Sequence, residues 1–154
     1  MCAMKQDSKP RQGASQAKSN GEPMQSAMPG IEECIDRCLE CHKVCLGEAT
    51  QHCLESGGDH VAPEHFRLMI TCAQICQTSA DFMLAGSMLH AQVCGVCALV
   101  CEQCAMSCRQ LDGMEMCAET CERCAKSCRQ MASAMGQDNM VSQMTANAPR
   151  AKAM

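Results

Sequence analysis

Aromatic residues are nearly absent from this chain of 154 residues, which has Phe66 and Phe82 but no Trp or Tyr. It therefore lacks the stacking platforms on which proteins hold unpaired bases. The Lys and Arg residues are scattered and the formal net charge is -4, so no surface suited to a phosphate backbone is expected. The composition argues against nucleic acid as a partner, and it leaves Cys and Met to supply the bulk of the core.

Long apolar runs are also missing. Residues 1–30 contain no apolar stretch that could be the core of a signal peptide. No later segment approaches the ~18 uninterrupted apolar residues of a membrane span. We therefore expect a cytoplasmic protein without a membrane partner. Both ends lack periodicity, so residues 1–29 and 137–154 are predicted to be disordered tails around one domain, residues 30–136.

Helix-starting proline and helix-capping residues divide this domain into four helical segments. Pro63 is a favoured first-turn residue, Ser87 can cap a helix, and Asp112 with Glu115 forms a capping-box-like start. The predicted helices cover about 31–54, 63–86, 87–110 and 112–135. Because the links between them are short, neighbouring helices must be antiparallel. The sequence predicts an all-α protein, an antiparallel up-down-up-down four-helix bundle.

Cysteine is the abundant residue, with 17 in the chain. All but Cys2 follow steps typical of one helix face, mostly of three and four residues. Charged residues such as Glu40, Lys43 and Glu102 occupy other angles, so the cysteines should face inward and line a core roughly 30 Å long. These predicted metal ligands are Cys34, Cys38, Cys41, Cys45, Cys53, Cys72, Cys76, Cys94, Cys97, Cys101, Cys104, Cys108, Cys117, Cys121, Cys124 and Cys128.

The chemistry of these thiols favours metal binding over other roles. A reducing compartment and the i, i+4 geometry on one helix both disfavour disulfides. Packing alone is an alternative, since free Cys behaves as a small hydrophobe, but Ala, Val and Leu would fill the space without oxidation risk. Thiolates select Cu(I), zinc or iron–sulfur clusters. A thiol seam without cations favours Cu(I), which is neutral at one ion per thiolate, so several Cu(I) ions per chain are expected.

Three alternatives remain open at this stage: a buffer for zinc, a buffer for another heavy metal, and an iron–sulfur electron carrier. Catalysis has little support, because no His or carboxylate is placed to act with a distinctive nucleophilic thiol. The expectation is a binding protein and not an enzyme.

Softer ligands are predicted at the two ends of the bundle. One end should gather His52, Cys53, His60, His65, Met114 and Met116, and the other Met83, Met88, His90 and Met135. His90 is the best candidate for an additional ligand, one turn before Cys94 on the same face. Met83 extends the thiol face of the second helix, which has few cysteines. His42 is interpreted as a surface or subunit-interface residue, and Met106 and Met131 as packing residues.

The densest part of the pattern is His90-x3-Cys94-x2-Cys97-Ala98-x2-Cys101-x2-Cys104-Ala105-x2-Cys108. It resembles the bacterial cytosolic copper storage proteins, and the likeness covers about residues 31–135. The resemblance implies storage of many Cu(I) ions inside a preformed four-helix bundle, assembly as a homotetramer, and admission of metal through an open end. A copper chaperone would be a natural partner. The Met-bearing tails depart from the family pattern.

Overall fold

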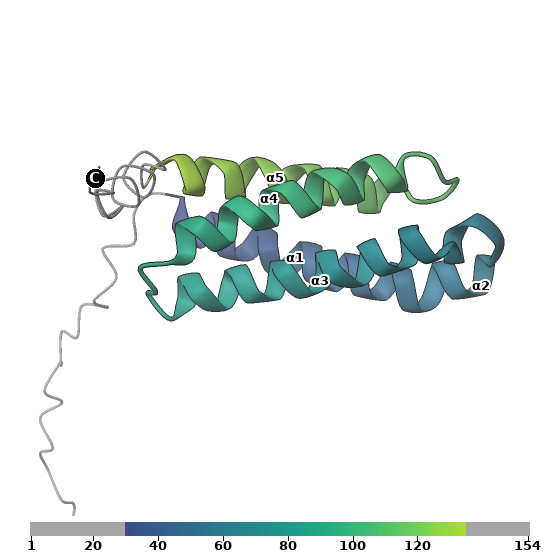
Figure 1. Ribbon diagram of the computed structural model, residues 1–154, viewed down its shortest axis with the longest axis horizontal. Coiled ribbons are helices and arrows are strands. Elements are labelled where there is room, and N and C mark those ends of the chain that lie inside the picture. Colours follow the sequence, from purple (N-terminus) through teal and green to yellow (C-terminus); the bar gives the residue numbers. More distant parts are fainter. Residues whose placement is uncertain (1–29, 135–154) are drawn as a thin grey trace, which may run out of the picture.

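The computed structural model of this protein describes residues 30–134, and all of its regular elements are helical (Figure 1). The predicted tails, with Cys2 and Met135, lie outside the described residues. The elements are α1 (Ile31–Glu48), η1 (Ala49–Cys53), α2 (Leu54–Ser56), η2 (Gly58–Val61), α3 (Pro63–Leu84), α4 (His90–Cys108) and α5 (Glu115–Ala134). The prediction of an all-α fold is confirmed.

Four long helices form an antiparallel bundle. Helices α1 and α4 each pack against both α3 and α5, and Figure 1 shows the α1–α3 pair lying along the α4–α5 pair. We call the end where α1 and α4 begin the His90 end. The opposite end, where α3 and α5 begin, is the His65 end. This up-down-up-down arrangement is the predicted one, and it brings inward stripes from four helices to one axis.

The first predicted helix contains an irregular turn that the sequence pattern did not reveal. Residues Ala49–Cys53 form a π-helical turn, and the short α2 then ends at Gly57, whose φ is 65°. In a regular α-helix Cys53 would lie about 80° away from the direction of Cys45. The wider π turn rotates Cys53 back toward the axis. Cys53 is accordingly fully buried, while His52 is half-buried.

Two predicted helix starts are too early. Helix α4 begins at His90 and not at Ser87, whose hydroxyl accepts a hydrogen bond from the Leu89 amide at 3.2 Å. Helix α5 begins at Glu115, because the first helical amide, that of Ala118, donates to the Met114 carbonyl and not to that of Asp112. The capping signals mark the links correctly, and the chain makes one more turn before each helix starts.

Helix α4 differs from the others in its outer face. Among the described residues it is the one helix that is long and apolar enough to cross a membrane, with a mean hydropathy of 1.4. This criterion uses length and composition only, and a helix that lends a buried stripe to a bundle core also meets it. Its exposed residues are all uncharged: Gln92, Val96, Leu99, Gln103 and Met106.

Candidate metal centre

The axis of the bundle is lined with sulfur. Each of the sixteen predicted core cysteines is at most 1% exposed, and all are free thiols. No Lys or Arg is buried anywhere in residues 30–134, and the buried polar residues there are His65, Ser79, His90 and Thr120. The absence of buried cations in this part of the chain means that metal–thiolate groups in the core would have to be close to neutral.

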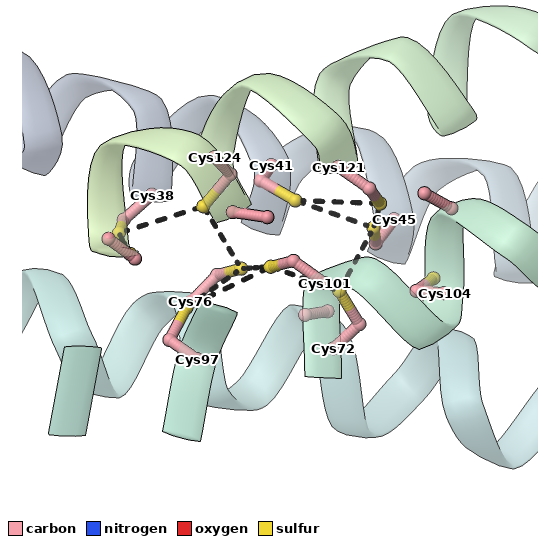
Figure 2. Packing of buried hydrophobic residues seen from close by; sticks show 14 of the residues in the cluster. Cys38, Cys41, Cys45, Cys72, Cys76, Cys97, Cys101, Cys104, Cys121 and Cys124 are labelled. Atoms are coloured by element: carbon pink, nitrogen blue, oxygen red, sulfur yellow. Dashed lines mark hydrogen bonds between the residues drawn. The ribbon is translucent and has the colours of Figure 1, made fainter. Parts of the chain in front are cut away.

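The thiols from different helices are in direct contact (Figure 2). The sulfur atoms of Cys38 and Cys128, and those of Cys45 and Cys121, lie 3.4 Å apart. If each metal–sulfur bond is about 2.3 Å, the length of a zinc–thiolate bond, a trigonal ion holds its sulfurs about 4 Å apart. The observed spacing therefore admits a trigonal thiophilic ion after small side-chain movements.

These contacts group the thiols into four clusters, in each of which all the sulfur atoms lie within 4.8 Å of one another. Neighbouring clusters share Cys41, Cys124 or Cys128, so they form one continuous series along the axis. The clusters are Cys34–Cys94–Cys128, Cys38–Cys97–Cys124–Cys128, Cys41–Cys76–Cys101–Cys124 and Cys41–Cys45–Cys72–Cys121. Such an array suits several bridged metal ions better than isolated ones.

Hydrogen bonds between thiols spread their pKa values apart. The interaction with Cys101 lowers the pKa of the Cys41 and Cys97 thiols, whereas the interaction with Cys104 raises the pKa of Cys45. Near the His65 end, burial raises the pKa of Cys53 to about 11. Cys53 therefore holds its proton until a metal displaces it.

Two residues predicted to be softer ligands, Met83 and His90, are buried at the His90 end. The Met83 sulfur lies 3.8 Å from the Cys94 sulfur, and both residues are buried. His90 Nδ1 donates a hydrogen bond to the Ser87 carbonyl at 2.7 Å, which leaves a lone pair on Nε2 when the ring is neutral. Nε2 is buried and has no hydrogen-bond partner in the structure. Met88 is 87% exposed and stays outside this group.

The His65 end gathers a second mixed group. The Cys53 sulfur lies 3.7 Å from His65 Nε2 and 3.9 Å from the Met114 sulfur. His65 Nδ1 is 2.8 Å from the Ser107 hydroxyl, and burial lowers the pKa of the imidazole. The lowered pKa favours the neutral ring, the form that can bind metal.

The other predicted residues of this end lie outside the core. The rings of His52 and His60 meet edge to face with their centroids 5.2 Å apart. His60 Nε2 donates to the Asp112 carbonyl at 3.0 Å. Met116 is 59% exposed. Among residues 30–134, no hydrogen bond links these three side chains to a core thiol.

Two methionines differ from the sequence prediction, and His42 makes a contact that the prediction did not include. His42 is half-buried, and its Nδ1 donates to the Ala73 carbonyl of α3 at 2.8 Å, while its place at a subunit interface stays a prediction. Met106 is 54% exposed and does not pack in the core. Met69 was not predicted to be a site residue, and its sulfur contacts three thiols. Met131 is buried, as expected of a packing residue.

This geometry defines a class of protein, a four-helix bundle whose interior thiols are placed to hold soft metal ions. The sequence profile of the copper storage protein family matches residues 27–133. The chain therefore belongs to the copper storage protein family, and the predicted family and storage function are confirmed. Together with the thiol clusters, family membership identifies the cargo as Cu(I), with several ions per chain.

Relatives of known structure share both fold and sequence. A protein from Nitrosospira multiformis is 55% identical, with a TM-score of 0.68 over 68% of this chain and 96% of that one. The Cu(I)-bound copper storage protein BsCsp3 is 35% identical, with a TM-score of 0.63 over 68% of this chain and 99% of that one. An uncharacterised cysteine-rich protein of Bacillus subtilis is 35% identical over 67 residues, which are 44% of this chain and 61% of the relative.

Proposed function

We propose that the sixteen core cysteines bind Cu(I) as a series of nearly neutral copper–thiolate clusters, with His90 and Met83 completing the ligand set at one end. The observation that carries this assignment is the four contiguous thiol clusters in a core without a buried Lys or Arg among residues 30–134. One Cu(I) per thiolate adds no net charge to that core. The protein acts as a store and not as a catalyst.

Charge also weighs against the other thiophilic metals. A zinc ion held by four thiolates carries a net charge of -2, and a four-cysteine iron–sulfur cluster is likewise anionic. Several such groups in one apolar core would require counter-ions, because uncompensated buried charge is costly. Cu(I) also accepts two or three sulfurs, which matches clusters that share thiols. Zinc storage is therefore the second candidate, and iron–sulfur electron transfer the third.

The orientation of the His90 ring prepares it to bind metal. His90 presents a fixed tautomer, because the Ser87 carbonyl holds the proton on Nδ1. An imidazole whose second nitrogen is oriented in this way is the usual form of a histidine ligand. Together with Met83 and Cys94 it offers three different soft or borderline donors at the His90 end, so we assign His90 and Met83 as ligands there.

We further propose that the protein is a cytoplasmic homo-oligomer, a tetramer by analogy with its family, that exchanges copper with a chaperone. The support for association is the outer face of α4. Its exposed residues carry no charge, and Glu102 beside them is paired with Arg129 of α5. Two copies of this face can meet without repulsion between like charges, and exposed apolar faces of this kind commonly mark interfaces.

The decisive experiment is an anaerobic titration of the fully reduced protein with Cu(I) against a chromophoric chelator. We expect many tightly bound ions per chain and a colourless product. Fewer than about five ions, less than one for every three core thiols, would contradict storage on these clusters. Displacement of Cu(I) by zinc would favour a zinc store, and a brown protein with visible absorption would favour an iron–sulfur carrier.

A further inference from the structure

Met69 lies inside the thiol array, between the clusters and the His65 end. Its side chain is fully buried on α3. The Met69 sulfur is 3.5 Å from Cys104, 3.4 Å from Cys108 and 3.9 Å from Cys117. Cys104 and Cys108 come from α4 and Cys117 from α5, so three helices converge on one thioether. None of these three thiols belongs to the four clusters described above.

Space filling alone does not explain this arrangement. Methionine is a flexible side chain that can fill a gap with its methylene or methyl groups, yet here the sulfur atom is the point of contact with all three thiols. Met131 shows the contrast, because it is buried in the same core and no hydrogen bond links its sulfur to a thiol of the described chain. Met83, the methionine at the other end, contacts a single thiol.

The spacing also suits a metal ion. Sulfur atoms about 4 Å apart surround a trigonal ion with bonds of about 2.3 Å, and the three Met69–thiol distances are 3.4–3.9 Å. Thioethers and thiolates together are a soft ligand set that selects Cu(I). The Met69 sulfur therefore lies at a distance from each of the three thiols that a shared ion could bridge after small side-chain movements.

We propose that Met69 is a Cu(I) ligand, and that with Cys104, Cys108 and Cys117 it forms a fifth site whose ion is more readily exchanged than the ions of the four-thiol clusters. This inference rests on the proposed copper–thiolate store. A thioether carries no charge, so an ion bound through Met69 has one anionic ligand fewer than an ion in a four-thiol cluster. Its electrostatic attraction to the site is weaker, and a competing ligand should remove it before the ions of the four-thiol clusters.

The ligand assignment can be tested by NMR of the full chain labelled with methyl-13C methionine. Reduced protein is titrated anaerobically with Cu(I), and the signals of Met69 and Met131 are assigned from the variants Met69→Leu and Met131→Leu. Metal binding at sulfur acts directly on the attached methyl group. We expect the Met69 signal to move or split during loading, and the Met131 signal to change much less. An unchanged Met69 signal at saturation would overturn the proposal.

The exchange order can be tested by releasing copper from loaded protein with excess chelator. Met69→Leu keeps the volume but removes the ligand, and release of the first ion should become at least about tenfold faster, a factor that even loss of a supporting partner can cause. Met69→Cys should shift about one ion from the fast to the slow phase, and Met131→Leu should behave as wild type. Identical release curves for all four proteins would contradict the proposal.

The copper content of the wild-type protein, measured in the same samples, distinguishes a failure of the proposed Met69 site from a failure of the proposed copper store. Normal uptake of many ions with an unmoved Met69 signal refutes the Met69 site and leaves the store intact. Uptake of fewer than about five ions refutes the copper store, and the Met69 site with it.

Discussion

Cys124 is the most informative position at which to remove a single sulfur atom. Two of the four clusters include it, and its sulfur lies 3.8 Å from those of Cys38 and Cys76. Replacing it with Ala leaves both clusters with three thiols. If charge balance sets the capacity, one lost thiolate costs one ion, and the weakened second cluster should release another. We therefore expect Cys124→Ala to bind about two tightly held ions fewer than wild type.

The substitution should have only a small effect on the metal-free fold. Removing one buried sulfur resembles the loss of a methylene group, which costs about 0.5–1.5 kcal/mol. For a bundle of this size that corresponds to a lower melting temperature by about 4–8 °C per kcal/mol. Ala is preferable to Ser here, because a hydroxyl without a partner in this core would add about 1–3 kcal/mol of destabilisation.

The matched control is Cys53→Ala, which removes an equally buried thiol that belongs to none of the four clusters. Both variants and the wild type would be titrated anaerobically with Cu(I) against a chromophoric chelator, and thermal unfolding of the metal-free proteins would confirm that they fold. The control should lose one ion at most. If the two variants bind equal numbers of Cu(I) ions, a thiol shared by two clusters contributes no more to the capacity than an unshared one, which would contradict the prediction.

Three further predictions concern the ends, the protons and the surface. His90→Ala should weaken the binding of one ion about tenfold or more in competition titrations. The control His42→Ala, on the outer side of the array, should leave binding unchanged. Equal effects of the two substitutions would exclude His90 as a ligand. Burial raises the pKa of Cys53 to about 11, so this thiol is protonated at neutral pH and copper must displace its proton. Affinity should therefore fall as the pH is lowered, and pH-stat titration should record about one proton released per Cu(I); copper uptake without proton release would contradict neutral copper–thiolate binding. Leu99→Lys on the outer face of α4 should reduce the oligomeric state in light scattering, whereas Gln130→Lys on α5 should not, and an unchanged mass for Leu99→Lys would rule out this face as the interface.

The fold and the position of the thiols could be predicted because one residue type marks the period. Steps of three and four residues place Cys94, Cys97 and Cys101 on one side of α4, whatever the rest of the helix does. Short links then force the helices to alternate in direction. The two observations together determine that all sixteen thiols point to one axis, and the structure buries every one of them.

What the sequence could not reveal depends on contacts between helices. The π turn at Ala49–Cys53 has no marker in the local pattern, and only the burial of Cys53 shows its effect. His42 is off the thiol stripe in sequence, but α1 and α3 approach closely enough for it to reach the Ala73 carbonyl. Met69 has the spacing of an ordinary core residue. Its three sulfur contacts come from α4 and α5, whose register against α3 is a property of the assembled bundle.

The chemistry of the thiol explains how one fold can serve both the empty and the loaded protein. A protonated thiol is a small hydrophobe with a weak hydrogen-bond donor, so sixteen of them can form an apolar core without metal. When Cu(I) replaces the thiol protons one for one, the core keeps its net charge, and no new counter-ion has to be buried. Because the sulfur atoms already lie 3.4–3.9 Å apart across the helices, loading requires little movement of the backbone. Capacity in such a protein depends on the number of inward sulfurs, and the order of release depends on where a neutral thioether or imidazole takes the place of a thiolate.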